Sequence, residues 1–354
     1  MEQLWDVIVI GGGQAGLASG YHLKKKGTSF LILEASDQAT GSWSHYYDSL
    51  KLFSPARLSS LPGMKIMGTV DHYPHRDEVI GYLQDYAQTF ELPIRMNQRV
   101  TAMEKSEDSF TIRTLQGDIF KARAIIIATG SFHNPFTPVI KDQEVFRGEV
   151  LHSSAYRNPN KYKGKRVVVV GRGNSAVQIA VELADHCFTS LAVLQPVEFV
   201  KQKILGLDLH YWIRALGLDT FPFWLFGKKA PVPSSVADLG DYKQKIEAGK
   251  PDQRNMFTSF YPDGVVWQDG AREAVDTVIF ATGYRPNYSY LNLIGALDTE
   301  GRALQKAGIS LSVPGLYFVG IEGQRSFASA TLRGVGPDAK YVVKNLDHYL
   351  KGRT

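Results

Sequence analysis

The sequence predicts an α/β protein built from two Rossmann-like dinucleotide-binding domains, with the second inserted into the first. Three observations predict this fold class. A β-branched run followed by a loop of the form GxGxx(G/A) occurs twice, at 6–16 and at 167–176. Each loop opens a helical segment, and a second apolar strand follows that helix. Each unit is also followed, further along the chain, by a strand that ends in Ala-Thr-Gly. Strand, glycine loop, helix and strand in this order are typical of a βαβ unit that binds a dinucleotide.

The first glycine loop, GGGQAG, supplies Gly11, Gly13 and Gly16. The first glycine permits a tight turn, the second lets backbone approach a pyrophosphate, and the third lets the helix pack on the strand. The N-terminus of the helix then offers free N–H groups to the phosphates. Glu34 lies 21 residues after Gly13, and an acid at this distance accepts hydrogen bonds from ribose hydroxyls. Because its charge repels a 2′-phosphate, this site is predicted to take FAD or NAD rather than NADP.

The second loop repeats the pattern with Gly171, Gly173 and Ala176, and alanine is allowed in the third position. Gln195 takes the place that Glu34 holds in the first unit. It neither repels a 2′-phosphate nor attracts one by charge, and Arg172 in the loop can contact a phosphate. We therefore expect NADPH or NADH as the ligand, with weak discrimination between them.

The order of the segments predicts how the domains are connected. Three alternating segments between the first loop and the first Ala-Thr-Gly predict a small antiparallel meander, and the stretch 145–156 is interpreted as linker. We expect a discontinuous FAD-binding domain over 1–160 and 277–354, with an NAD(P)H-binding domain over 161–276 inserted into it. This is the FAD/NAD(P)-binding arrangement, and its final helix is expected from about Pro337.

Composition limits the other classes of function. The chain has 354 residues, of which 44% are hydrophobic and 21% charged, which suits two folded domains. The single cysteine, Cys187, excludes an internal disulfide and a dithiol redox pair. The net charge is +5, but the lysines and arginines are scattered among acidic residues and form no basic tract. No nucleic acid partner is therefore expected. No apolar run reaches the ~18 residues of a membrane span, no metal site is indicated, and the chain is expected to be cytoplasmic.

The stretch VFRGEVLHSSAY contains F-x-G-x-x-x-H-x-x-x-Y, formed by Phe146, Gly148, His152 and Tyr156. Together with GGGQAG, GSW, GRGNSA, FATGYRPN and SATLRGVGPDA, it makes the sequence resemble the flavin-containing monooxygenases among the class B flavoprotein monooxygenases. More narrowly, it is similar to their small bacterial CzcO-like relatives. The resemblance covers essentially the whole chain, and the tyrosine-ended spacing is its most specific part.

The resemblance implies FAD and NADPH or NADH as cofactors, and a small-molecule substrate and O2 as partners. NAD(P)H would reduce FAD by hydride transfer. The reduced flavin would react with O2 to form a C4a-hydroperoxyflavin, which would oxygenate a soft sulfur or nitrogen nucleophile. No catalytic side chain is identified. His152 would couple nicotinamide binding to domain geometry. Larger members carry an asparagine near the flavin, in the segment that here reads LKLFSPARLS and offers Phe53, Ser54 and Pro55. Stabilisation of the oxygenated flavin is therefore expected to be poorer, or to come from the bound nicotinamide.

These motifs and the resemblance together give the predicted cofactor-binding residues. They are Gly11, Gly13, Gln14, Ala15, Gly16, Glu34, Ala35, Ser42, Trp43, Val100, Ala128, Thr129, Gly130, His152, Gly171, Arg172, Gly173, Asn174, Ser175, Ala176, Gln195, Ala281, Thr282, Gly283 and Gly320.

Two other functions stay open at this point. One is an NAD(P)H oxidase or flavin reductase of the same fold that never oxygenates a substrate, and the other is a non-catalytic, flavin-binding redox sensor. A disulfide reductase is disfavoured, because Ala15 stands where its catalytic cysteine would be needed. Substrate identity, coenzyme preference and assembly, including a homodimer, are left open by the sequence.

Overall fold

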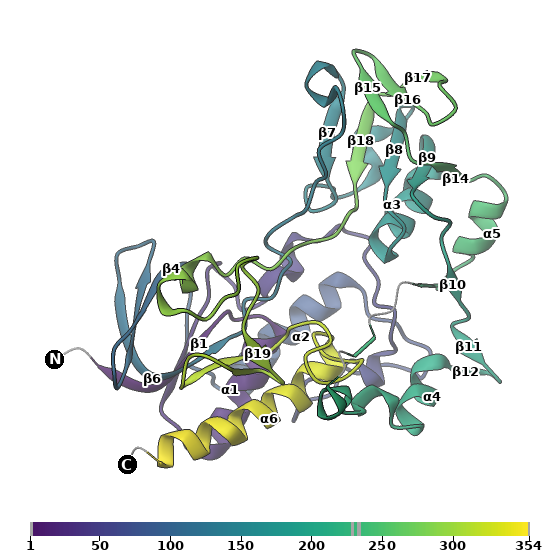
Figure 1. Ribbon diagram of the computed structural model, residues 1–354. Coiled ribbons are helices and arrows are strands. Elements are labelled where there is room, and N and C mark those ends of the chain that lie inside the picture. Colours follow the sequence, from purple (N-terminus) through teal and green to yellow (C-terminus); the bar gives the residue numbers. More distant parts are fainter. Residues whose placement is uncertain (1–2, 228–229, 232–234, 353–354) are drawn as a thin grey trace.

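The computed structural model describes residues 3–227, 230–231 and 235–352. It has two lobes, each built on its own sheet, joined by two crossing segments (Figure 1). Among the described residues, no helix is both long and apolar enough to cross a bilayer.

The first lobe is built on a nine-stranded sheet whose central strands run parallel. Its main path is β19 (Gln305–Lys306), β20 (Ile309–Ser310), β21 (Leu316–Phe318), β6 (Ile119–Ile127), β1 (Leu4–Ile10), β2 (Phe30–Leu33) and β3 (Ile94–Arg95). The strands β4 (Val100–Lys105) and β5 (Phe110–Thr114) join β6 in an antiparallel meander. The meander is confirmed where the alternating segments predicted it.

In the buried part of strand β1, from Val7 to Ile10, the side chains alternate between two cores, as the period of a strand requires. Val7 and Val9 pack into the core that is covered by α1 (Gln14–Lys26), α2 (Arg76–Thr89) and α6 (Leu332–Lys351). Ile8 and Ile10 pack into the core beneath the meander and the short helix η7 (Ser289–Ile294). Burial on both faces explains why the strand reads as one continuous apolar run.

Helix ends follow local chemistry. α1 stops at Gly27, whose φ of 69° is left-handed, and its N–H bonds the carbonyls of Leu23 and Lys24. α6 begins at Leu332, five residues before the predicted start at Pro337. The prediction was wrong because it placed the proline at the helix entrance, whereas Pro337 lies inside the helix.

The second lobe is built on a five-stranded parallel sheet. Its order is β14 (Asp252–Asn255), β9 (Phe188–Val193), β8 (Arg166–Val170), β18 (Thr277–Phe280) and β7 (Glu149–His152). Helix α3 (Asn174–Ala184) packs on one face. Beside the other lies a small antiparallel sheet of β15 (Ser259–Tyr261), β16 (Gly264–Val266) and β17 (Arg272–Ala274).

The stretch 145–156, predicted to be linker, instead contains strand β7, which pairs with β18 at the edge of the second sheet. Gly148, which directly precedes β7, is closely packed, because an added Cβ would lie 2.2 Å from the Phe146 ring. Because β7 and β18 both pair in the second sheet, the boundaries drawn at 160/161 and 276/277 do not follow the sheet. We propose a second domain that runs from β7 to β18. The sequence pattern missed β7 because only two of its four residues, Val150 and Leu151, are apolar.

A long excursion leaves the second lobe after β9 and reaches toward the first lobe near α6 (Figure 1). It contains β10 (Phe199–Val200), β11 (Lys203–Ile204), β12 (Leu207–Asp208), α4 (Leu209–Ala215) and two short 3-10 helices, η5 (Leu218–Thr220) and η6 (Phe223–Phe226). The chain returns through β13 (Val236–Ala237) and α5 (Tyr242–Glu247).

Candidate active site at the junction of the two lobes

The first glycine loop lies at the carboxyl end of β1, where parallel sheets bind ligands. Gly11 has a φ of 106°, and an added Cβ would lie 2.6 Å from the Ala128 carbonyl oxygen. An added Cβ at Gly16 would lie 1.8 Å from the Gly11 oxygen. Gly13 is the N-cap of α1, and no side chain caps the helix. The first N–H groups of α1 are therefore available to a diphosphate.

Glu34 follows β2 directly, with 6% of its surface exposed. Its Oε2 accepts the Gly12 N–H at 2.6 Å, and its Oε1 accepts the N–H and hydroxyl of Ser36 at 2.9 and 2.8 Å. Carboxylate oxygens have further lone pairs, so the anchored side chain can still receive ribose hydroxyls. Ala35, which follows Glu34, is half-buried. The segment that leads to half-buried Val100 lies alongside, because the Gln98 N–H donates to the backbone oxygen of Glu34 at 2.7 Å.

Two other segments close over the start of α1. Trp43, beside Ser42 in the 3-10 turn η1 (Gly41–His45), donates its indole N–H to Gln14 Oε1 at 3.2 Å. Gln14 in turn donates its Nε2 to the Ala330 oxygen at 2.7 Å. This clamp joins the glycine loop, the η1 turn and the chain just before α6. Sequence reasoning missed Ala330, whose left-handed φ of 69° gives no signal in the sequence.

The second glycine loop repeats the first. Gly171 has a φ of 135°, and an added Cβ would lie 2.5 Å from the Ala281 oxygen. Gly173 is the N-cap of α3, again without a capping side chain. Ala176 is fully buried at the third position. Asn174 Oδ1 accepts the Ala237 N–H at 3.3 Å, which holds the returning excursion against the loop. The same reasons therefore make this loop fit a second dinucleotide.

The residues predicted to read the second ribose lie at the rim of this loop. Gln195 is exposed just after β9, and Arg172 is half-buried in the loop. Position 195 carries an uncharged glutamine where the first unit has Glu34, so its side chain does not repel a 2′-phosphate. Ser175 lies in the first turn of α3, close to the phenol of Tyr47 from the first lobe.

The two Ala-Thr-Gly segments cross between the lobes. Ala128, Thr129 and Gly130 follow β6, and Ala281, Thr282 and Gly283 follow β18. The Thr282 hydroxyl donates to the Phe136 oxygen, and the Phe136 N–H donates to the Gly283 oxygen at 2.9 Å. The two crossing segments are therefore bonded to each other as well as to their own sheets.

His152 ends β7 beside this crossing and is 8% exposed. Its Nδ1 accepts the Ser154 N–H at 3.1 Å, so the ring proton lies on Nε2, which donates to the Gly283 oxygen at 3.0 Å. Burial lowers the pKa of His152, although the bond to Gly283 opposes this shift. The imidazole ring is therefore neutral, and both of its nitrogens are hydrogen-bonded within the protein. This is expected of a residue that positions the crossing segment rather than of a catalytic acid or base.

Aromatic rings connect the first loop to the crossing. Trp43 lies edge-on to Tyr46 at 5.5 Å, Tyr46 to Phe132 at 5.7 Å, and Phe132 to Tyr284 at 5.1 Å. Tyr284 then lies edge-on to His152 at 4.9 Å. Burial raises the pKa of Tyr46 well above its ordinary value. The space between the two nucleotide loops is therefore bordered by an apolar aromatic wall that the spacing of the motifs did not predict.

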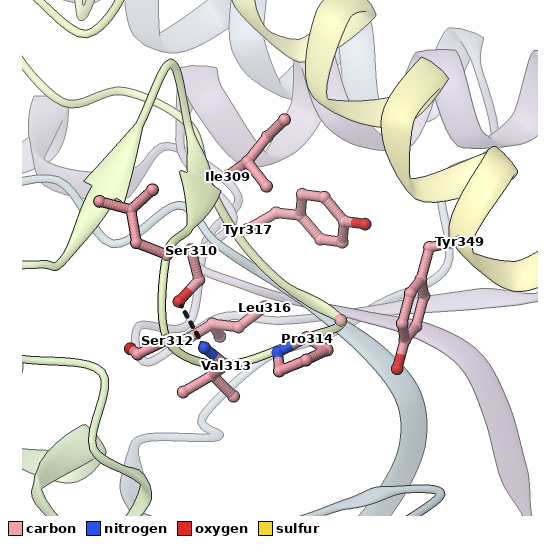
Figure 2. Close-up of a pocket in the computed structure, with 10 residues that line it drawn as sticks. Ile309, Ser310, Ser312, Val313, Pro314, Leu316, Tyr317 and Tyr349 are labelled. Atoms are coloured by element: carbon pink, nitrogen blue, oxygen red, sulfur yellow. Dashed lines mark hydrogen bonds between the residues drawn. The ribbon is translucent and has the colours of Figure 1, made fainter.

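Pockets among the described residues include one between the two lobes and one on the first lobe. One, of about 470 Å³, lies between the 57–65 segment, the start of α6 and the excursion. The other, of about 310 Å³, is framed by the turn into β21 and by Tyr349 near the far end of α6 (Figure 2). The second pocket lies at the end of the sheet opposite the glycine loops, so it is not part of the candidate active site.

Comparison with known proteins agrees with this geometry. A family model described as "Pyridine nucleotide-disulphide oxidoreductase" matches residues 8–220. An uncharacterized CzcO-like oxidoreductase of Geobacillus kaustophilus (strain HTA426) is 36% identical over 98% of this chain and 99% of its own. A flavin-containing monooxygenase from Stenotrophomonas maltophilia, of known structure, superimposes with a TM-score of 0.85 at 32% identity, over 99% of both chains.

The chain belongs to the pyridine nucleotide-disulphide oxidoreductase family. Within it, the CzcO-like relative and the matching monooxygenase structure confirm the predicted kinship with the flavin-containing monooxygenases, the predicted fold class and a flavin- and NAD(P)H-dependent enzyme. A plant relative, indole-3-pyruvate monooxygenase YUCCA4 of Oryza sativa subsp. japonica, is 29% identical over 96% of this chain and 86% of its own.

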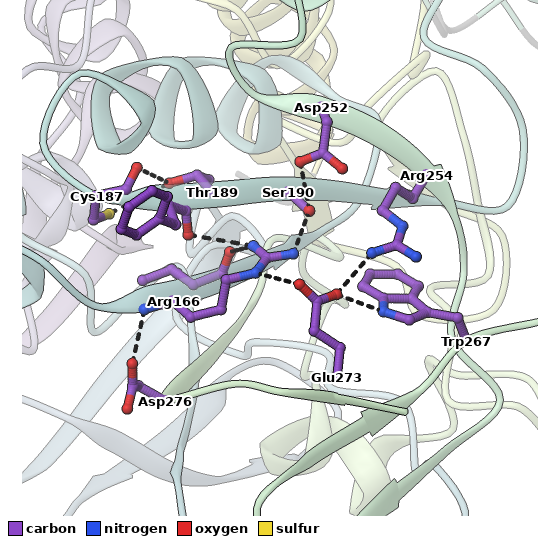
Figure 3. A network of polar contacts seen from close by, with 11 residues as sticks. Arg166, Cys187, Thr189, Ser190, Asp252, Arg254, Trp267, Glu273 and Asp276 are labelled. Atoms are coloured by element: carbon purple, nitrogen blue, oxygen red, sulfur yellow. Dashed lines mark hydrogen bonds and ion pairs between the residues drawn. The ribbon is translucent and has the colours of Figure 1, made fainter. Parts of the chain in front are cut away.

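Although the family is described by disulphide chemistry, this member has no pair of thiols, because Cys187 is its only cysteine. Its Sγ lies 3.2 Å from the Leu183 oxygen and 3.3 Å from Thr189 Oγ1. Burial raises the pKa of this thiol. Figure 3 shows it beside the Arg166 network, at the end of the second sheet opposite Gly171. The thiol is therefore remote from both loops.

Proposed function

We propose that this flavoenzyme is an FAD-dependent, NAD(P)H-using monooxygenase that inserts one oxygen atom into a soft sulfur or nitrogen nucleophile of a small molecule. The observation that carries the proposal is the pair of uncapped helix N-termini, α1 and α3, each at the carboxyl end of its own parallel sheet. One chain thus offers two diphosphate sites that meet at one crossing.

In this proposal the first loop and Glu34 hold FAD, and the second loop holds the nicotinamide dinucleotide. Gly11, Gly13 and Gly16 admit the diphosphate, and the carboxylate of Glu34 orients the ribose through bonds already fixed to Gly12 and Ser36. Gln195 leaves the coenzyme choice open between NADPH and NADH. When bound, the flavin supplies hydride acceptance and activation of O2.

The protein's own contribution is positioning and exclusion of water. His152 keeps the crossing in one arrangement through the Gly283 oxygen. The rings of Trp43, Tyr46 and Phe132 limit water beside the flavin site. No described side chain has to act as a nucleophile, because the oxidising power belongs to the cofactor.

The test is a balance of equivalents on the flavin-loaded protein. NADPH or NADH is supplied with a thioether or a tertiary amine, and consumption of coenzyme and O2, oxygenated product and released peroxide are measured together. We expect product to match coenzyme consumed and peroxide to be minor. Coenzyme consumption without product for any soft nucleophile would reject the proposal.

One observation favours an oxidase as the second candidate. In the segment where larger members are expected to carry an asparagine, this chain has Phe53, Ser54 and Pro55. The Phe53 ring lies 5.9 Å from the His210 ring and its backbone oxygen accepts Gln202 Nε2 at 3.0 Å, while the Ser54 hydroxyl is hydrogen-bonded to Ser59 Oγ at 2.8 Å. A phenyl group donates no hydrogen bond to a flavin–oxygen adduct. Peroxide formed in a one-to-one ratio with coenzyme consumed, across all nucleophiles tried, would establish this candidate.

A further inference from the structure

The 470 Å³ pocket is formed jointly by the two lobes. Its walls are the 57–65 segment, the 326–337 stretch around the start of α6, and the 214–220 part of the excursion. The η5 turn of the excursion, which follows α4, lies against the start of α6 (Figure 1). Ligand pockets commonly form at such junctions, and this volume suits a small organic molecule.

The pocket carries an excess of positive charge. Arg57, Lys65, Arg214 and Arg333 line it, against the single acid Asp219. The first three are exposed at the rim, whereas the Arg333 side chain is only 6% exposed. Clustered cations in a partly enclosed space raise the local concentration of anions.

Arg333 is incompletely paired. Its Nε donates to Asp219 Oδ1 at 3.0 Å, and the Asp219 side chain is 9% exposed. Its Nη1 is buried and has no hydrogen-bond partner in the part of the chain that the structure describes. A buried N–H without an acceptor costs about 1–3 kcal/mol, and more on a charged group. Because Arg333 lines the pocket, an anion that enters can supply the missing acceptor once the side chain turns Nη1 toward the opening.

We propose that this pocket binds the carboxylate of a small organic acid, with Arg333 as its anchor, and that this acid is the substrate of the monooxygenase proposed above, on which this second step rests. A carboxylate fits better than a phosphate, because Asp219 already neutralises one edge of the guanidinium and repels a dianion. Leu58, Leu61 and Met64 in the same lining contact an apolar body.

The pocket also lies next to the first dinucleotide site. Ala328 lines it, and two residues later the Ala330 oxygen accepts Gln14 Nε2 from the start of α1. The N-terminus of α6, whose partial positive charge adds to that of Arg333, begins directly afterwards at Leu332. An acid anchored here would have its body close to the flavin segment of the first lobe.

The test measures binding without turnover. The flavin-loaded protein, without nicotinamide, is titrated with benzoate, with benzamide as its neutral isostere, and with inorganic phosphate, and the flavin spectrum is followed. We expect benzoate to bind at least about tenfold more tightly than benzamide or phosphate, which corresponds to one charge-assisted hydrogen bond. Arg333→Gln should abolish that preference, and Arg333→Lys should keep part of it. Arg57→Gln should weaken benzoate binding and its salt dependence slightly, and Lys306→Gln, outside the lining, should change nothing.

Several outcomes would overturn the inference. Equal binding of benzoate and benzamide, or an unchanged preference in flavin-loaded Arg333→Gln, removes the anchor. Phosphate binding as tightly as benzoate removes the carboxylate assignment. Loss of flavin from both Arg333 variants would assign Nη1 to the flavin instead. The proposed function fails separately: an acid that binds here but is never oxygenated defeats the function and leaves the site intact.

Discussion

At the scale of single residues, the two glycine loops solve the same steric problem twice. At Gly11 and at Gly171 the backbone is left-handed, and an added Cβ would meet the carbonyl oxygen of Ala128 or Ala281 at 2.6 or 2.5 Å. Each glycine therefore lies directly against the Ala-Thr-Gly segment of its own lobe. The glycines therefore set the distance between a diphosphate site and the crossing as well as the turn itself.

The matched variants Gly11→Ala and Gly171→Ala should separate the two cofactors. Gly11→Ala is expected to purify without flavin, whereas Gly171→Ala should retain flavin and raise the KM for NAD(P)H by about tenfold or more, since displaced backbone misplaces the phosphates. Flavin absorbance and steady-state kinetics measure this. Gly240→Ala, where an added Cβ meets no atom within 4 Å, is the control. A flavin-bound Gly11→Ala protein would contradict the assignment of the first loop.

Coenzyme choice is predicted to depend on the exposed Gln195. Gln195→Arg adds a guanidinium that can pair with a 2′-phosphate but gains nothing from a ribose hydroxyl. We expect the ratio of kcat/KM for NADPH over NADH to rise about tenfold, which corresponds to roughly 1.4 kcal/mol. Gln195→Ala serves as the control for loss of the amide. A ratio that stays unchanged in the arginine variant would place the 2′ position elsewhere.

At the scale of elements, the sequence predicted what local patterns encode. β1, α1, β2 and the meander follow from apolar periodicity and from Gly27. Strand β7 was missed because only Val150 and Leu151 of its four residues are apolar, and because it is fixed by pairing with residues of β18 that lie 128 positions further along the chain. The Gln14–Ala330 clamp and the pocket at Arg333 were missed for the same reason. Contacts between distant segments leave no period in the sequence.

Helix α1 carries a titratable group where α6 covers it. His22 lies beside Gly336, and burial lowers its pKa to about 4; the nearby Gly336 backbone opposes this shift, and the charges of Lys340 and Lys25 add to it. The folded state therefore binds fewer protons than the unfolded state between about pH 4 and 6.5. Stability from this residue is present above the unfolded pKa and is lost as the pH falls toward the folded one.

We expect the wild-type protein to lose about 1–2 kcal/mol of unfolding free energy relative to His22→Gln between pH 7 and pH 5, allowing for partial exposure of the ring. Glutamine keeps a polar side chain beside the Gly336 backbone but does not titrate. Urea unfolding of both proteins at each pH measures the difference. His186→Gln is the control at an exposed histidine. Parallel curves for wild type and His22→Gln would show that His22 does not titrate as inferred.

At the scale of the whole molecule, the lobes are joined by more than their two crossing segments. Tyr47 belongs to the first lobe but is 2% exposed within the core of the second, near Tyr156 at 6.2 Å. Its hydroxyl donates to Gln178 Oε1 at 3.0 Å, and Gln178 also contacts the backbone of Lys51. The fingerprint tyrosine, Tyr156, donates in turn to Glu182 at 2.8 Å. The Tyr47 side chain therefore connects the segment after η1, in the first lobe, to helix α3 in the second lobe.

Because this link is a buried aromatic side chain, Tyr47→Ala should uncouple the lobes. Truncating a buried aromatic residue costs about 3–5 kcal/mol, and here the loss falls on the contact between the lobes. We expect wild-type protein to release flavin and lose helical circular dichroism in one coincident thermal transition. In Tyr47→Ala, flavin release should precede the main loss of structure. Tyr47→Phe keeps the ring and loses only the bond to Gln178, so it should cost about 1 kcal/mol and keep one transition. Coincident transitions in Tyr47→Ala would mean that the crossing segments alone hold the two lobes together.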